Sequence, residues 1–321
     1  MASSLTSNAA KLLLVASLVA CSAAPHRPIW SHPDGSCAID HPAVRILSLT
    51  GATCDDGIFV VPYQVNLLAM EALAEPSTHP FVRAYIRWYL DNLNASDRHG
   101  LSGTIYDLVV YGNGDEDWSG NYDSADAYAA TFLSLVTRYV EATKDRELAL
   151  EINPTLEDIA YVILTLQASE DGLTWVWPKH DSKYLMDNCE TYAGLMDYDH
   201  LRREFMGKTD SEYKDVALAI RDGIKENLFD LERLNFYFGI DRDLTPYRSN
   251  WHTRYPDALA QLFPIVYGVV EARSPLARHL WQEFSLRHGV QNMESEEQRM
   301  IVRKAHALVM GKRTISKGAK Q

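Results

Sequence analysis

The sequence predicts a mainly α-helical fold in which helical hairpins follow one another around a ring. Apolar residues recur with the period of an amphipathic helix from residue 61 almost to the end of the chain. In addition, one pattern, D-x-x-[DE]-x-Y-A-[AG], occurs twice, beginning at Asp123 and at Asp187. Two similar helix starts with another helix between them are typical of a repeat architecture.

The individual helices can be placed from this apolar period and from their start signals. Pro62 suits a first helical turn, and Thr155, followed by two acidic residues, predicts a capped helix start. Short alternating stretches at 104–112 and 234–240 predict small hairpins of strand on the connecting loops. The predicted helices span residues 61–74, 80–94, 123–143, 155–169, 186–205, 211–230, 255–270 and 274–289.

Alternate helices are expected to form an inner and an outer layer. Every second helix opens with a related signal, at Pro62, Asp123, Asp187 and Pro256, and these starts are about 60 to 70 residues apart, as expected for a repeated hairpin. These helices are apolar over most of their circumference, which favours an inner position. The helices between them are amphipathic and more charged, as expected of an outer layer.

Composition excludes several classes of protein. With 321 residues, of which 46% are apolar and 23% charged, the chain can bury a core as one large or two small domains and is not disordered. A net charge of −12 without a basic stripe argues against a nucleic-acid surface. The same balance disfavours a polyanionic substrate. With 17 Tyr and 7 Trp, the chain has flat rings available for stacking.

The first 20 residues have the features of an export signal. Lys11 precedes an apolar stretch, 12–20, that is too short to span a bilayer but suits the core of a signal peptide. The sequence LVAC, ending at Cys21, resembles a bacterial lipoprotein signal, in which the cysteine is lipidated. We therefore expect an exported protein held by a lipid anchor at a membrane of the cell envelope, in the periplasm or at the cell surface. The alternative is an ordinary signal cleaved after S-A-A, with Cys21 incidental.

The remaining cysteines fit an exported protein. Cys37 and Cys54 lie in a proline-containing linker and irregular segment, 21–55, and an oxidising compartment would allow a disulfide between them worth about 3 kcal/mol. Two buried thiols are the alternative. Cys189 is expected to pack as a small apolar residue. Because no Cys or His spacing suggests zinc, we expect neither a metal nor a cofactor.

Six segments of the chain carry a family resemblance: VPYQVNLLAMEAL (61–73), GTIYD (103–107), YDSADAYAATFL (122–133), DGLTWVWP (171–178), YLMDNCETYAGL (184–195) and RYPDALAQLFPIVYG (254–268). Together they resemble the six-hairpin glycosidase superfamily, whose fold is the (α/α) toroid. The resemblance covers residues 56–290 and implies a cleft for an oligo- or polysaccharide at the N-terminal ends of the inner helices. This chain has about four to five hairpins, so the ring is either open or shortened. A charged helix and tail are expected at 291–321.

Acidic residues stand at or before the predicted inner-helix starts, where the toroid would gather them. Hydrolysis of a glycosidic bond needs one carboxyl group to protonate the leaving oxygen and a second as base or nucleophile. The first catalytic candidates are Asp123 and Asp187, followed by Asp126 and Glu190. Asp107 and Asp257 are candidates for binding substrate. The competing interpretation is that D-x-x-[DE] is a capping box, which would stabilise each helix by about 1 kcal/mol without any substrate.

Aromatic residues near the same helix starts are candidates for stacking on sugar rings. Tyr63 and Tyr255 adjoin prolines at helix starts, where they could donate hydrogen bonds or fix the entry of the chain. Histidines such as His99 and His180 lack metal spacing and are expected on the surface or behind the site. Packing within loops is the alternative for the tryptophans that precede inner helices: Trp118, Trp175, Trp177 and Trp251.

The sequence therefore predicts a carbohydrate-active protein, and a glycoside hydrolase before other classes. No G-x-S-x-G, P-loop or G-x-G-x-x-G pattern supports another chemistry. Two alternatives remain open. One is a non-catalytic surface lipoprotein that binds glycan through its tryptophans, and the other is a polysaccharide lyase, which would need a Tyr, His or Arg group to abstract a proton.

Overall fold

A computed structural model of the protein describes residues 39–49, 57–289 and 293–311. Within these ranges the chain forms ten α-helices and eight short strands, and no helix is both long and apolar enough to cross a bilayer. The predicted signal peptide, the lipidation of Cys21 and the disulfide between Cys37 and Cys54 lie outside the described residues and remain predictions. The mainly α fold class is confirmed.

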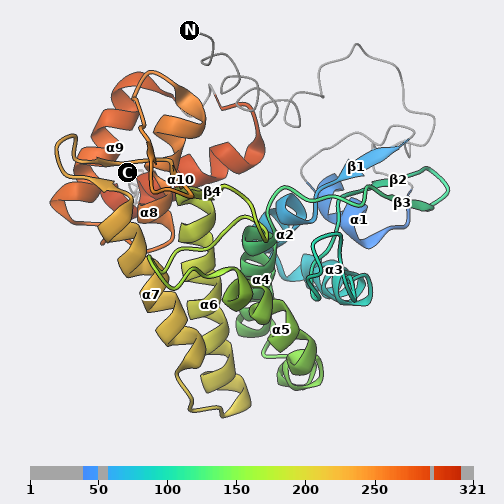
Figure 1. The fold of residues 1–321 in the computed structure, drawn as a ribbon. Helices are drawn as coiled ribbons and strands as arrows, with labels where there is room; N and C mark the ends of the chain where they lie inside the picture. The colour runs from blue at the N-terminus through green and yellow to red at the C-terminus, as the bar shows by residue number, and fades with distance from the viewer. Residues whose placement is uncertain (1–38, 50–56, 290–292, 312–321) are drawn as a thin grey trace, which may run out of the picture.

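Five helices form the inner layer, and each contacts its neighbours (Figure 1). Helix α2 packs against α4, α4 against α6, α6 against α8, α8 against α10, and α10 again against α2, so that the ring is closed. The inner helices are α2 (Pro62–Ala72), α4 (Ala125–Thr143), α6 (Leu185–Met206), α8 (Phe263–Val266) and α10 (Glu296–Met310).

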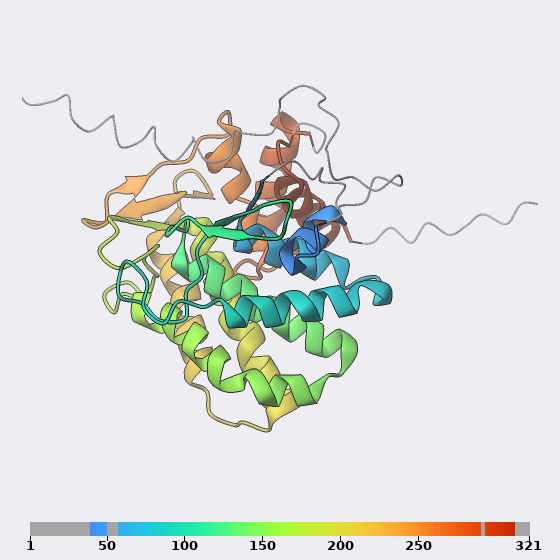
Figure 2. The same cartoon turned by 90° about the vertical axis from the view of Figure 1, so that its right-hand side faces the viewer.

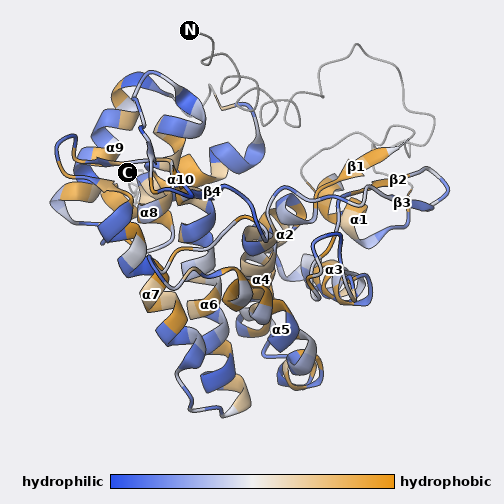
Figure 3. Cartoon of the chain, in the orientation of Figure 1, coloured by the Kyte–Doolittle hydropathy of each residue, from blue (hydrophilic) through white to orange (hydrophobic). Residues whose placement is uncertain are grey.

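The outer layer consists of the helices between these. Helix α1 packs on α2 and α3, α3 on α2 and α4, α5 on α4 and α6, α7 on α6, and α9 on α10 (Figure 2). Hydrophilic and hydrophobic residues both recur along α7, as expected of a helix with one face on the core (Figure 3). The outer helices are α1 (Pro42–Ser48), α3 (His79–Asp91), α5 (Arg146–Leu166), α7 (Glu212–Asn227) and α9 (Pro275–Arg287).

The sequence predicted a ring that is either open or shortened. In the structure, helix α10 closes the ring. Its buried face includes Met300, Ile301 and Ala305, and Ser295 caps its start by accepting a hydrogen bond from the Gln298 amide at 3.2 Å. The high charge of this segment belongs to its outward face and to its first turn. A charged amphipathic helix therefore occupies the fifth inner position.

Two predicted helix boundaries were wrong. Helix α5 begins at Arg146, nine residues before the expected cap at Thr155, and Asp145 caps it by accepting from the Leu148 amide at 3.1 Å. Pro154, which suggested a helix start, lies inside α5. The helix expected at 255–270 is broken into a π-helical turn, Arg254–Ala258, and the short α8.

Short antiparallel strands lie on the loops, as predicted. One sheet joins β1 (Ile58–Val60), β2 (Leu108–Val110) and β3 (Glu116–Trp118). A second joins β4 (Ser182–Tyr184), β7 (Gly239–Asp241) and β8 (Pro246–Tyr247), and a third pairs β5 (Phe229–Asp230) with β6 (Asn235–Phe236). A single 3-10 turn, Pro76–Thr78, precedes α3 in the described chain. These hairpins tie the loops together between consecutive helices.

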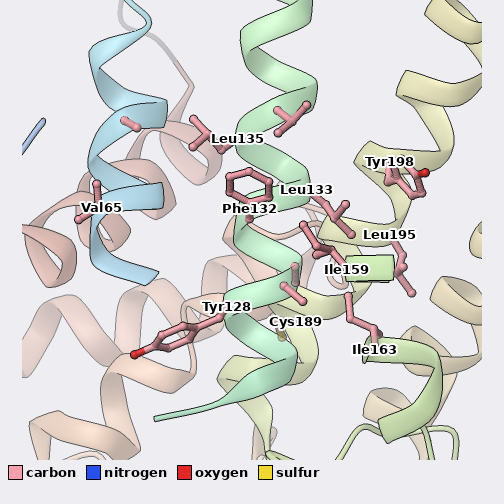
Figure 4. Close-up of a cluster of buried hydrophobic side chains, with 14 of the residues drawn as sticks. Val65, Tyr128, Phe132, Leu133, Leu135, Ile159, Ile163, Cys189, Leu195 and Tyr198 are labelled. Atoms are coloured by element: carbon pink, nitrogen blue, oxygen red, sulfur yellow. The ribbon is translucent and has the colours of Figure 1, made fainter. Parts of the chain in front are cut away.

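A close backbone contact in the core joins α4 and α6. A Cβ atom at Gly194 would stand only 2.5 Å from the carbonyl oxygen of Ala130, so only glycine fits there. Ala130 and Gly194 are the last residues of the two copies of the repeated pattern, which therefore meet across this contact. Phe132 and Leu133 of α4 and Leu195 of α6 belong to the same buried cluster as Cys189, which is buried as predicted (Figure 4).

Candidate functional site

The N-terminal ends of the inner helices bring acidic side chains together. The charges of Asp126, Glu190 and Asp123 all act on Asp187 and raise its pKa further than burial alone would. Four of the group were predicted from the sequence as catalytic candidates. We call the group the acidic mouth, and its carboxyl groups are Asp107, Asp123, Asp126, Asp187, Glu190 and Glu297.

The capping-box interpretation of the repeated pattern is wrong for both copies. The N-cap residues are Ser124 for α4 and Tyr184 for α6, and neither makes a side-chain cap. Helix α4 starts two residues after Asp123, whereas α6 starts two residues before Asp187. The pattern thus occupies different positions relative to the two helix starts. Its leading residues, Asp123 and Asp187, do not cap these helices.

Asp123 and Asp187 have the least restrained carboxyl groups of the mouth. Within the described chain, neither carboxyl group forms a hydrogen bond to another residue. Burial raises the pKa of both, and it raises that of Asp187 well above its usual range. Asp123 nevertheless has an exposed surface. The raised pKa and the exposed surface of Asp123 agree if protein surrounds its carboxyl group on all sides but one. The exposed side leaves access for a ligand.

Tyr255 also lies among the carboxyl groups of the acidic mouth. Burial, followed by the charges of Glu297, Asp123, Asp187 and Glu190, raises the pKa of its hydroxyl, although 39% of the residue is exposed. This hydroxyl is therefore a hydrogen-bond donor that is open to water and faces the mouth.

Asp126 has a structural role. It is fully buried, and its Oδ2 accepts from the Thr174 hydroxyl at 2.7 Å while its Oδ1 accepts from the Ala127 amide at 3.0 Å. The Thr174 amide in turn donates to Asn188 of α6 at 2.8 Å. Burial raises the pKa of Asp126 to about 7. Asp126 thus fastens the start of α4 to the loop before α6.

Glu190 lies at the centre of the ring. Its Oε1 accepts hydrogen bonds from the hydroxyls of Tyr63 at 2.8 Å and Tyr267 at 2.9 Å. The Tyr63 hydroxyl also lies 3.3 Å from Oε1 of Glu297 in α10. Burial raises the pKa of Glu190 well above its usual range, and that of Glu297 to about 7. Burial therefore favours the neutral form of the hydrogen-bonded Glu190, and Tyr63 joins it to α10.

Asp107 belongs to the mouth, but Asp257 does not. Asp107 accepts from the Tyr128 hydroxyl at 2.8 Å, and burial, opposed by this bond and assisted by the charge of Asp123, raises its pKa to about 7. Asp257 instead accepts from the backbone amide and side chain of Asn250, at 2.9 and 2.8 Å. Its role in the structure is to hold the loop before the π-helical turn.

Among the four tryptophans, Trp177 is the one connected to the mouth through described contacts. It stacks on His99 with ring centres 5.7 Å apart and meets His180 edge-on at 4.3 Å, and the charge of His180 acts on Asp123. Trp175 lies under the Lys183 ammonium at 4.1 Å.

The other two tryptophans have local contacts. Trp118 stacks on Trp88 at 5.9 Å, and the Trp251 carbonyl faces the His288 ring at 2.9 Å. The predicted single face of four tryptophans is therefore not seen in these contacts.

Sequence reasoning missed Glu297 and the position of His180. A signal for Glu297 was present, because Ser295 followed by Gln298 has the spacing of a capping box and marks a helix start at Glu296. Nothing in the local sequence placed His180 next to Asp123, since that contact depends on the fold of the loop before β4. The described residues contain no group of His, Cys, Asp and Glu suited to a metal ion.

Comparisons with known proteins identify relatives in fold only. No protein-family model and no curated protein matches the chain. A solved rhamnosidase from Klebsiella oxytoca with rhamnose bound is similar over 83% of this chain and 52% of its own, with a TM-score of 0.59 and 14% identity. The chain thus spans about half the length of that protein.

Weaker similarity extends to a cellobiose 2-epimerase from Bacillus thermoamylovorans, over 79% of this chain and 60% of that one, with a TM-score of 0.46 and 10% identity. A GH76 mannanase from Bacteroides thetaiotaomicron is similar over 79% and 63%, with a TM-score of 0.42 and 13% identity. At the level of fold, the predicted resemblance is confirmed: the chain has the fold of the six-hairpin (α/α) toroids, with five inner helices in its described part.

Proposed function

We propose that this protein is a carbohydrate-active enzyme that hydrolyses glycosidic bonds at the acidic mouth. The observation that carries the proposal is the pair Asp123 and Asp187. They are acidic side chains from neighbouring inner helices, they have no hydrogen bond to another described residue, and burial raises the pKa of both. Two carboxyl groups held in different environments are the minimum that this reaction requires.

The two carboxyl groups suit different roles. Asp187 has the pKa that is raised the further, which favours its protonated form, and it would donate that proton to the glycosidic oxygen as the bond breaks. Asp123 is open to water, and the charge of His180 opposes the rise of its pKa. Its carboxylate would take the proton from the attacking water or attack the anomeric carbon itself. Tyr255 would donate a hydrogen bond to a sugar hydroxyl, and Trp177 would stack on a ring.

The fold comparison supports a carbohydrate substrate without establishing it. The Klebsiella protein of similar fold is a rhamnosidase with rhamnose bound, and its chain is about twice as long as the matched region. Proteins of one fold often differ in function, so the proposal depends on the carboxyl pair and not on this likeness.

The test is release of reducing ends from neutral and acidic polysaccharides and from aryl glycosides, including an aryl rhamnoside. The full chain is compared with Asp123→Asn, Asp187→Asn and the double variant, and Asp117→Asn, an exposed acid of β3, is the matched control. We expect release by the native chain and the control and none by the double variant at equal thermal stability. Equal release by the double variant would contradict the carboxyl mechanism, whereas glycan binding without any release would identify a non-catalytic binding protein.

We also propose that the chain is exported and anchored by lipid at Cys21, as the N-terminal sequence suggests. Labelling with a radioactive fatty acid in a bacterial host should mark the native chain and not a Cys21→Ala variant. Label in both proteins, or in neither while the cleaved chain is found in the soluble envelope fraction, would contradict the anchor.

A further inference from the structure

A second cavity lies inside the ring, beyond the acidic mouth. Its volume is about 270 Å³, and it is lined by residues of α2, α4, α6 and α10 together with Val266 and Tyr267. The lining residues Met70, Arg138 and Lys304 stand in the C-terminal halves of their helices, whereas the mouth is formed by the N-terminal ends of the same helices. The cavity is therefore at the opposite end of the ring. We call it the lumen cavity.

The floor of the lumen cavity is the buried carboxyl group of Glu190, which is 2% exposed. Both tyrosines that bind Glu190 donate to its Oε1, and no hydrogen bond within the described chain reaches its Oε2. Burial favours the neutral form of this carboxyl group, in which Oε2 can form a hydrogen bond with a neutral ligand.

The walls provide both polar and apolar groups. Arg138 and Lys304 bring N–H donors, and Thr131 and Ser134 bring hydroxyls. Leu67 and Met70 of α2, with Leu308 of α10, line the cavity with apolar side chains. A cyclic ligand with hydroxyl groups at its edge and C–H groups on its faces would contact both the polar and the apolar walls.

The Lys304 ammonium already has a partner, because it lies 2.7 Å from Glu71. The charge of Arg138 acts on the carboxyl group of Asp197. An anionic ligand would have to compete with Glu71 for Lys304, whereas a neutral one would not. The volume lies near the lower end for small-molecule sites, which is about 300 Å³, and leaves room for one small ring rather than a chain of sugars.

We propose that the lumen cavity binds one neutral polyol the size of a monosaccharide, on the side of Glu190 away from Asp123 and Asp187. The proposal does not depend on hydrolysis at the mouth. The cavity is open at the end formed by Ala307 and Leu308, both exposed, so a ligand can enter without passing the carboxyl pair.

The test is binding of glucose, mannose and rhamnose, each measured by saturation-transfer NMR and by calorimetry on the full chain. The Asp123→Asn, Asp187→Asn double variant serves as the reference, because it removes the charges of the mouth. Ala307→Trp fills the entrance from an exposed helix position, and Ala272→Trp, a partly exposed position remote from the cavity lining, is the matched control. Gluconate is the charged probe.

We expect at least one sugar to bind the double variant with saturation, and Ala307→Trp in that background to weaken binding at least tenfold while Ala272→Trp does not. Arg138→Met should weaken it severalfold. Absence of saturable binding to the double variant, binding unaffected by Ala307→Trp, or a preference for gluconate would each overturn the proposal. Hydrolysis by a chain carrying Ala307→Trp alone reports on the mouth, so failure of one proposal can be told from failure of the other.

Discussion

The two copies of the repeated pattern, at the start of α4 and the start of α6, use the same residue types differently. In both copies the carboxyl group of the first acid, Asp123 or Asp187, makes no hydrogen bond to another described residue. In both, the second acid is buried and bonded, Asp126 to Thr174 and Glu190 to two tyrosines. The second position therefore holds the ring together, and in the function we propose the first position serves chemistry.

The largest effect should come from the first acids. Asp187→Asn or Asp123→Asn should lower kcat by about 10²–10⁴, the usual contribution of general acid or base catalysis. Neither change should lower the melting temperature, because no hydrogen bond to another residue is lost. The pair of measurements is kcat on the substrate found by the release screen and the thermal midpoint of each variant. A variant that is active but unstable would reverse the assignment of roles.

The second acids should show the opposite result. Asp126→Ala removes the 2.7 Å acceptor of the Thr174 hydroxyl and leaves it only the Asn188 Oδ1 at 3.2 Å, so it should lower the free energy of unfolding by about 1–3 kcal/mol. Chemical denaturation measures this. Thr174→Val alone and the double variant complete a cycle that isolates the bond, and Asp126→Ala with unchanged stability would show that the bond is not formed.

The last position of the pattern gives a smaller effect. Gly194→Ala would press a methyl group against the Ala130 carbonyl and should cost about 1–3 kcal/mol by overpacking. Ala193→Gly, at the preceding and half-buried position of the same helix, controls for the change in helix propensity. Equal stability of Gly194→Ala and the native chain would mean that α4 and α6 are farther apart than described.

The smallest effect concerns pH. Burial raises the pKa of Asp107, Asp126 and Glu297 to about 7, whereas such groups titrate near pH ~4 in an unfolded chain. Between these values the folded state binds more protons at these groups than the unfolded state, so their contribution to the free energy of unfolding falls as pH rises from about 4 to about 7 and then levels off.

Glu297→Gln removes one of these three groups and should lessen that fall, while Asp117→Asn should not change it. Denaturant titrations at intervals across this pH range provide the measurement. An unchanged slope for Glu297→Gln would place its carboxyl group in water.

The sequence was sufficient for the helical architecture because the apolar period is a local property of each helix. It was sufficient to place Asp123 and Asp187 at the starts of inner helices, because a repeated pattern marks those starts, and their catalytic role remains a prediction. It failed at α5, where Pro154 is tolerated inside the helix, and at the helix expected from 255, which breaks at a π-helical turn. In those places the local signal and the packing disagree, and packing decides.

The composition of the mouth was harder to predict than its location. Asp257 has the same local surroundings as the other acids, and only the contact with Asn250 assigns it to a loop. Glu297 lies in a segment whose charge suggested a solvated end, and only the contact with Tyr63 places it in the ring. Both assignments depend on partners that no single helix specifies.

The closing of the ring by α10 has a consequence for how the protein is made. Tyr63 and Glu297 are 234 residues apart in the chain, yet they meet at the centre of the mouth. During synthesis, α2, α4 and α6 can pack as soon as they leave the ribosome, but the fifth position stays empty until α10 emerges. The mouth is thus completed only after α10 has been translated, so that a nascent chain can pack α2, α4 and α6 before it has a finished site.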